Sequence, residues 1–192
     1  MIRVDAALKY DRLSVAEYLE GEELSEVKHE YIGGVLFAMA GATRDHNRIA
    51  GSIFAELRNR LKGGCCEPFF GDVKVRLMSL NQDIFYYPDV MVACDPRDKD
   101  PKFVRFPTVI LEIISESTER TDRGEKFTNY TQIESLQEYI LVAQERAEVT
   151  IFRRSNGWQA EVLRSRSDVM RLASIEFSMP LAEIYEGVTF AR

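Results

Sequence analysis

YYPDVMVACDP, residues 86–96, places one acidic residue directly before an apolar run. Residues 90–94 form an apolar run of the kind that a buried strand shows, and Asp89 stands directly before it, behind a proline. An unpaired carboxylate in apolar surroundings is costly, so Asp89 needs a partner, a proton or a metal ion. Other segments of the sequence indicate which of these three Asp89 has.

TVILEIIS, residues 108–115, places a second acid on a core strand. Side chains alternate across a sheet, so Glu112 shares its face with Ile110 and Ile114 and is the only charge in the run. We expect Glu112 to lie beside Asp89, where the two carboxylates would repel each other without a cation. Carboxylates and waters suit Mg²⁺ or Mn²⁺, although either acid alone could cap a turn or face water.

The segment TDRGEKFTNY, residues 121–130, supplies cations after the second strand. Arg123, Lys126 and Tyr130 fall on one helical face, and Lys126 could reach back to the strand of Glu112. There it could orient an attacking water or stabilise charge on a phosphate. The alternative is a surface ion pair of Lys126 with Asp122, one helical turn earlier.

Two further candidates precede these segments. His46 lies between Arg44 and Arg48 near the start of a predicted helix, where a lone histidine is more often a cap or packing residue. Glu30 comes before a predicted hairpin and, by spacing alone, could be any solvated glutamate. Neither residue is assigned a role by its neighbours.

Composition predicts one soluble domain over residues 1–192. Apolar residues make up 45% and charged residues 29%, and no apolar run approaches the ~20 residues of a membrane span. The net charge of −6 argues against non-specific coating of nucleic acid, though not against a local contact surface. Three cysteines, two of them adjacent, predict reduced thiols in a cytoplasmic protein.

Periodicity and turn signals predict an α/β fold with a mixed central sheet flanked by helices. A capping box at Ser14 begins a short helix, and Thr43 caps a long one over residues 45–61. An Asp122–Glu125 capping box begins another, to about residue 132. The predicted strands are 31–32 with 35–40, 65–70, 73–77, 85–94, 108–115, 137–143, 148–153 with 158–163, and a last short helix follows residue 180.

Together these residues resemble the PD-(D/E)XK nuclease superfamily, with its restriction-endonuclease-like fold, and most closely the bacterial Uma-two family. The matching segments, in family order, are HEYIGG (29–34), His46, YPDVMV (87–92), VILEIISEST (109–118), D-x-x-x-K-x-x-x-Y (122–130) and EYILV (138–142). One departure stands out. The usual lysine two residues after the glutamate is Ile114 here, so the catalytic lysine has either migrated to Lys126 or been lost.

The resemblance implies a Mg²⁺- or Mn²⁺-dependent endonuclease that hydrolyses nucleic acid, with DNA as the expected substrate. Asp89 and Glu112 would bind the metal with the carbonyl of Ile113, and Lys126 and Glu30 would assist. It also implies a homodimer. The residues expected to contact nucleic acid are Arg44, His46, Arg48, Arg123 and Tyr130.

Two other classes of function stay open from the sequence. One is a catalytically inactive member of the fold that binds nucleic acid or protein, which Ile114 and the acidic net charge favour. The other is a glycosidase that uses Asp89 and Glu112 as an acid/base pair, with Tyr86 and Tyr87 as sugar platforms.

Overall fold

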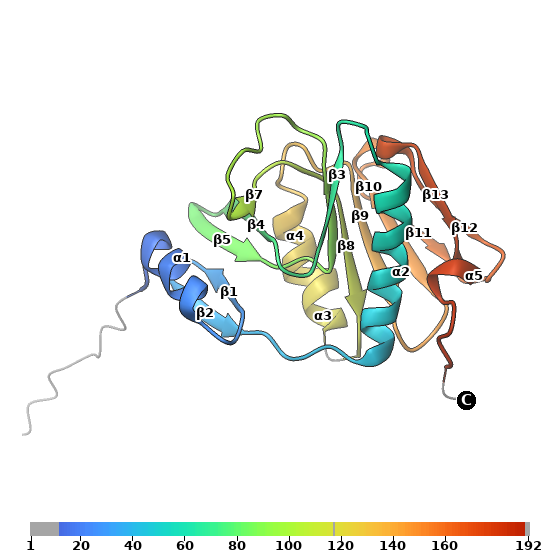
Figure 1. The fold of residues 1–192 in the computed structure, drawn as a ribbon, viewed down its shortest axis with the longest axis horizontal. Coiled ribbons are helices and arrows are strands. Elements are labelled where there is room, and N and C mark those ends of the chain that lie inside the picture. The colour runs from blue at the N-terminus through green and yellow to red at the C-terminus, as the bar shows by residue number, and fades with distance from the viewer. Residues whose placement is uncertain (1–11, 117, 191–192) are drawn as a thin grey trace, which may run out of the picture.

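The computed structural model describes residues 12–116 and 118–190, and Figure 1 shows their arrangement. The helices are α1 (Val15–Leu24), α2 (Arg44–Arg60), α3 (Glu119–Thr121), α4 (Phe127–Tyr130) and α5 (Leu181–Ile184). The strands are β1 (His29–Ile32), β2 (Val35–Ala38), β3 (Glu67–Phe70), β4 (Lys74–Ser79), β5 (Gln82–Tyr86), β6 (Val90–Ala93), β7 (Phe103–Val104), β8 (Pro107–Ile114), β9 (Glu138–Ala143), β10 (Val149–Arg153), β11 (Ala160–Leu163), β12 (Val169–Leu172) and β13 (Phe177–Pro180).

The main sheet is mixed, as the sequence predicts. Its order is β11-β10-β9-β8-β6-β3, with β8 and β9 parallel and the other neighbours antiparallel. The alternation of β8 divides two cores. Val109, Leu111 and Ile113 pack under α2, whereas Ile110 and Ile114 face the opposite layer. Glu112 therefore projects from the second face, among apolar neighbours.

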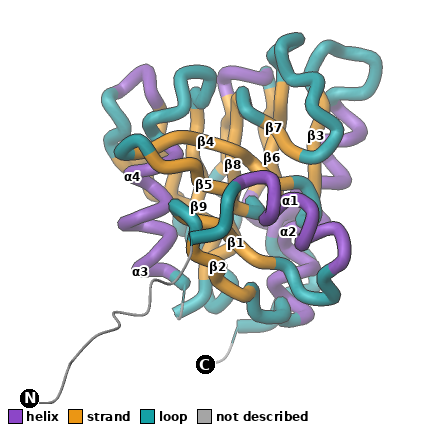
Figure 2. The backbone as a smooth tube through the Cα atoms, turned by 90° about the vertical axis from the view of Figure 1, so that its left-hand side faces the viewer, coloured by secondary structure: helices purple, strands orange, loops and turns teal. Residues whose placement is uncertain are grey.

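That opposite layer is a second sheet, of order β2-β1-β5-β4-β7. Figure 2 shows it lying in front of the main sheet, with β1 and β2 at its lower edge. The expected strand 85–94 is wrong, because it is two strands, β5 and β6, one in each sheet. Pro88 has no N–H to give a ladder, so the chain bends there and carries Asp89 from one layer to the other.

The helix that carries Lys126 differs from the expected one. It begins at Glu119, and Asp122 lies inside it, in a π-helical turn over Asp122–Lys126, so Asp122 is not a cap. Gly124 within that turn weakens the α-helical preference, and π turns add a residue that shifts the phase of the helix. Asp122 and Lys126 are both buried in this turn.

Thr43 caps α2 as predicted, since its Oγ1 accepts a hydrogen bond from the backbone N–H of His46 at 3.1 Å. We expect Thr43→Ala to lower the free energy of unfolding by about 1 kcal/mol, because a helix N–H loses its acceptor. Urea denaturation measures this, and Thr43→Ser, which keeps the hydroxyl, serves as the control. Equal stability of the alanine and serine variants would contradict the assignment of the cap.

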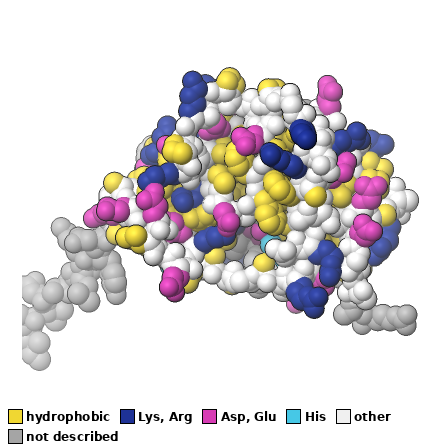
Figure 3. Space-filling model, viewed as in Figure 1, with side chains coloured by type: hydrophobic (Ala, Val, Ile, Leu, Met, Phe, Trp, Pro, Cys, Tyr) yellow, Lys and Arg dark blue, Asp and Glu magenta, His cyan; other side chains and the backbone are white. Residues whose placement is uncertain are grey.

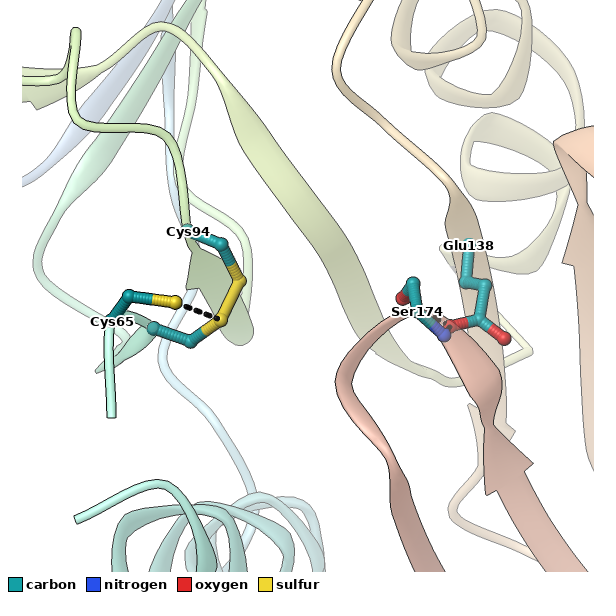
Figure 4. Close-up of a disulfide and its surroundings, with 5 residues drawn as sticks. Cys65, Cys94, Glu138 and Ser174 are labelled. Carbon is teal, nitrogen blue, oxygen red and sulfur yellow. Dashed lines mark hydrogen bonds between the residues drawn. A yellow bond between two sulfur atoms is a disulfide. The ribbon is translucent and has the colours of Figure 1, made fainter. Parts of the chain in front are cut away.

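The cysteines do not follow the expectation of three reduced thiols. Cys66 and Cys94 form a disulfide that joins the start of β3 to the end of β6, and Cys65 is free and exposed (Figure 4). Paired strands bring the two thiols together, which spacing in the sequence does not reveal. Disulfides are rare in reducing compartments, so the cysteines no longer support a cytoplasmic location.

We expect Cys94→Ser to lower the free energy of unfolding by about 3 to 4 kcal/mol, because the crosslink spans 28 residues and restricts the unfolded chain. Chemical denaturation with and without dithiothreitol measures the effect. Cys65→Ser, which leaves the disulfide in place, is the matched control. Three alkylatable thiols in the oxidised native protein would contradict the pairing.

Candidate active site

A cleft of about 930 Å³ opens where the two sheets and the first turn of α2 meet. Its lining includes the following residues that the sequence singled out: Glu30, His46, Asp89, Glu112, Ile113 and Lys126. They come from β1, α2, the bend before β6, β8 and the helix after β8. The fold therefore brings together residues that lie up to 96 positions apart in the chain.

Asp89 and Glu112 converge at the centre of this site. Val90 of β6 stands opposite Leu111 of β8, which places the two acids side by side across the antiparallel pair. Asp89 Oδ2 accepts a hydrogen bond from the N–H of Ile113 at 2.7 Å, and Glu112 Oε2 accepts one from the N–H of Asp89 at 3.3 Å. A backbone N–H group of the neighbouring strand segment therefore holds each carboxylate in place, and the two carboxylates lie side by side.

Lys126 contacts three carboxylates at once. Its Nζ lies 2.9 Å from Glu30 Oε1, 3.3 Å from Glu112 Oε1 and 3.6 Å from Asp122 Oδ1. The reach toward Glu112 and the pair with Asp122 were alternatives in the sequence, and both occur, in the interior. Burial lowers the pKa of Lys126, but the three carboxylates outweigh burial and raise it well above its usual value.

The cluster holds more acid than base. Glu30, Glu112 and Asp122 contact the single ammonium of Lys126, and Asp89 lies beside Glu112. Burial raises the pKa of Glu112 well above its usual value; Lys126 opposes this, and Asp89 adds to it. A group of this kind favours either extra protons or a second cation.

His46 and Tyr130 bind the acids directly. His46 Nε2 lies 3.2 Å from Asp89 Oδ2; burial lowers the pKa of the imidazole, and contact with Asp89 outweighs burial and raises it. Tyr130 was expected at the nucleic-acid surface. It is instead fully buried, and its hydroxyl donates to Glu112 Oε1 at 3.0 Å, so it supports the carboxylate from beneath.

The expected arginines lie outside the cleft lining. Arg44 is exposed at the start of α2, and Arg48 pairs with Asp45 one turn further on. Arg123 pairs with Glu119, with its Nε 2.7 Å from Glu119 Oε1, and does not line the cleft with Lys126. These side chains border the site but do not complete it.

Glu22 is a residue of the site's framework that sequence reasoning missed. Its Oε1 accepts from the N–H of His29 at 2.7 Å and from the hydroxyl of Tyr87 at 2.9 Å. It thereby ties the strand that carries Glu30 to the bend that carries Asp89. Nothing in an acidic helical segment distinguishes this glutamate from its solvated neighbours, so no sequence signal identifies it.

The same contacts remove the sugar platforms of the glycosidase hypothesis. Tyr87 is buried against Glu22, and Tyr86 is buried with its hydroxyl donating to Glu125 Oε1 at 2.9 Å. Tyr86 does not line the cleft. Tyr87 does, but it is only 4% exposed, and the Nζ atoms of Lys28 and Lys74 lie over its ring at 5.7 and 5.1 Å from the ring centre, so neither tyrosine offers an open face to a sugar. That part of the expectation is wrong.

Glu138 shows how a buried strand carboxylate looks when its role is structural. It lies 2% exposed on β9, and its oxygens accept from the N–H groups of Ala173 and Ser174 and from Arg153. Figure 4 shows it beside Ser174, whose hydroxyl also donates to it. Both carboxylate oxygens of Glu138 accept hydrogen bonds from the protein, and the residue lies outside the cleft. In the acid cluster, by contrast, Glu30 Oε1 has no such donor within the described residues.

The donor set fits a hard divalent cation. Glu30 Oε1 is buried and, although near Lys126, has no hydrogen-bond donor of suitable geometry within the described residues. Asp89 and Glu112 add carboxylate oxygens, the ligands that Mg²⁺ and Mn²⁺ take. In residues 12–116 and 118–190 no three His, Cys, Asp or Glu side chains are already placed around one metal position. Two carboxylates, a carbonyl and several waters suffice for Mg²⁺.

The surface around the site is mixed in charge. Figure 3 shows acidic and basic side chains interspersed on the face it presents, without a field of one sign. No helix in the described part of the chain is long and apolar enough to cross a membrane.

Comparisons with known proteins agree with this arrangement. A structure from Anabaena variabilis, described as "a putative nuclease belonging to DUF820", superposes with a TM-score of 0.70 over 86% of this chain and 93% of that one, at 14% identity. That likeness shows the restriction-endonuclease-like fold. Two uncharacterized proteins of Synechocystis sp., slr1290 and sll1609, are each 35% identical, over 99% and 69% of this chain and 100% and 75% of their own lengths.

Residues 15–182 match the model of the family Uma2, described as "Putative restriction endonuclease". This range contains the whole acid cluster, Lys126 and His46. The chain therefore belongs to the Uma2 family of nuclease-like proteins.

Proposed function

We propose that the protein is a Mg²⁺- or Mn²⁺-dependent phosphodiesterase that hydrolyses nucleic acid, with DNA as the expected substrate. One observation carries the proposal: Asp89 and Glu112 converge in a cleft, each fixed by the backbone beside the other, with Lys126 between Glu112 and Glu30. The family and the fold support nuclease-like chemistry at this place.

Asp89, Glu112 and the carbonyl of Ile113 would hold the cation. When bound, it supplies neutralisation of the phosphate charge and a lower pKa for an attacking water. Lys126 donates from its fixed position to a phosphate oxygen or to that water. Glu30 and Asp122 hold the ammonium in place, and His46 orients Asp89 through the contact with Oδ2.

Lys126 also bears on the inactive-relative hypothesis. Ile114, in the usual lysine position, is an apolar residue buried in the second core, and that position therefore supplies no cation. The ammonium of Lys126 reaches Glu112 from the following helix instead, which favours a migrated lysine over a lost one. Arg44, Arg48 and Arg123, at the border of the site, are proposed to contact the phosphate backbone, which positions nucleic acid without reading sequence.

Cleavage of single-stranded and plasmid DNA tests the proposal. We expect products with Mg²⁺ or Mn²⁺, none with EDTA, and recovery when the metal is added back, because the carboxylates cannot act on a phosphate alone. Activity that persists in EDTA would contradict the metal dependence. Binding without cleavage in every metal would select the inactive relative.

We also propose a homodimer and, although the Cys66–Cys94 disulfide counts against it, a cytoplasmic location. The homodimer rests on the resemblance to nucleases that pair in order to cut two strands, and sedimentation velocity tests it: a monomer at micromolar concentration would contradict it. Cell fractionation tests the location.

A further inference from the structure

The cleft has an apolar wall that the proposed chemistry does not use. It consists of Val27 and the segment FAMAGA, residues 37–42, which runs from β2 to the cap of α2. Val27 and Phe37 are 47% and 49% exposed. Single exposed apolar residues are ordinary on a protein surface, but these gather in the hollow that holds the acid cluster.

Strand pairing fixes the direction of Phe37. β1 and β2 are antiparallel, and Phe37 stands directly opposite Glu30. Residues opposite each other project from the same face, with Cβ atoms about 4.5–5.5 Å apart. The carboxylate of Glu30 contacts Lys126 in the cleft. The ring of Phe37 therefore lies on the cleft side of the hairpin, beside Glu30.

The ring of Phe37 is open to a ligand. Other rings of this layer, including those of Tyr18, Tyr31 and Phe85, pack against one another in a buried cluster. Within the described residues, neither an aromatic ring nor a cationic side chain stacks on Phe37. An unstacked phenyl ring at the rim of a cleft offers a face to a planar apolar group.

A nucleotide presents the matching chemistry: a phosphodiester for the carboxylate–lysine side and a flat base for the phenyl side. A base within a duplex already has both faces stacked on its neighbours, so only an unpaired base can lie on Phe37. The cleft volume of about 930 Å³ also lies within the range of about 300–1,000 Å³ in which single small ligands bind.

Given the proposed phosphodiesterase activity, we propose that Phe37 stacks on the base of an unpaired nucleotide beside the phosphate that is cut. The substrate is then single-stranded or locally unpaired nucleic acid. Phe37 acts as a specificity-determining residue, and base–aromatic stacking of this kind tolerates any base sequence.

Binding of two probes tests the role of Phe37: a short oligothymidylate and a phosphodiester oligomer of the same length with abasic residues throughout. We expect wild type to bind oligothymidylate more tightly, and Phe37→Ala to weaken that binding about 10- to 100-fold while leaving the abasic oligomer unchanged. Phe37→Trp, which keeps a stacking face, retains the preference, and Phe37→Leu loses it. Leu36→Ala, on the other face of the same strand, is the matched control and changes neither affinity.

Equal binding of oligothymidylate by wild type and Phe37→Ala, or equal binding of the two probes by wild type, would overturn the inference. So would tighter binding of a blunt duplex than of its single strand. Thermal unfolding at the wild-type temperature shows that each variant is folded. The assay needs no turnover, so Phe37-dependent binding without cleavage refutes the phosphodiesterase alone, and cleavage without Phe37 dependence refutes stacking alone.

Discussion

Asp89→Asn and Glu112→Gln each lower DNA cleavage by about a thousandfold or more. Each substitution removes one negative oxygen donor where the cation is expected, and several kcal/mol of lost transition-state stabilisation corresponds to a loss of this size at 1.36 kcal/mol per tenfold. The measurement is the initial rate of cleavage at saturating Mg²⁺, with metal affinity measured in parallel by calorimetry with Mn²⁺.

The matched control for these variants is Asp72→Asn. Asp72 lines the same cleft, but its side chain is 79% exposed and pairs with Lys28 rather than with Lys126. We expect its activity to stay within twofold of wild type. If cleavage survives both Asp89→Asn and Glu112→Gln, the carboxylate pair is not the catalytic centre.

Lys126→Met abolishes cleavage and, in EDTA, lowers the free energy of unfolding by about 3 to 5 kcal/mol. The reason is that Glu30, Glu112 and Asp122 lose their shared partner in the interior, and an unpaired buried charge costs about this much. Chemical denaturation and the cleavage rate give the two effects separately.

Added Mg²⁺ distinguishes a metal site from a purely structural ion cluster in the same variant. A cation that binds only the folded state stabilises it by about 2.7 kcal/mol at a hundredfold excess over Kd. We therefore expect Mg²⁺ to restore much of the stability of Lys126→Met but none of its activity. Lys126→Arg, which keeps the charge, serves as the conservative control. No stabilisation by Mg²⁺ or Mn²⁺ would contradict a cation site among these carboxylates.

Local sequence rules predicted the elements whose signals are local. The capping box at Ser14 and the alternation of 108–115 reappear unchanged, because caps and strand periodicity depend on neighbours in the chain. The break at Pro88 was missed because an apolar run on both sides hides a change of sheet. β12 and β13 were also missed, since short strands at the end of a chain lack a distinctive pattern.

The candidate site was predictable only in its acids. An isolated Asp89 or Glu112 in an apolar strand is conspicuous, and strand order then brings the two together. Glu138 looks the same in sequence, yet its hydrogen bonds from Arg153, Ala173 and Ser174 make it structural. Glu22, Asp122 and the burial of Tyr130 depend on tertiary contacts and on a π turn, for which the sequence carries no comparable signal.

Anomalous diffraction from crystals soaked in Mn²⁺ shows whether Asp89 and Glu112 bind a divalent cation. We expect one strong anomalous peak within coordination distance of the carboxylates of Asp89 and Glu112 and of the carbonyl of Ile113. A fully soaked crystal without density there, or with Mn²⁺ bound only elsewhere, would contradict it.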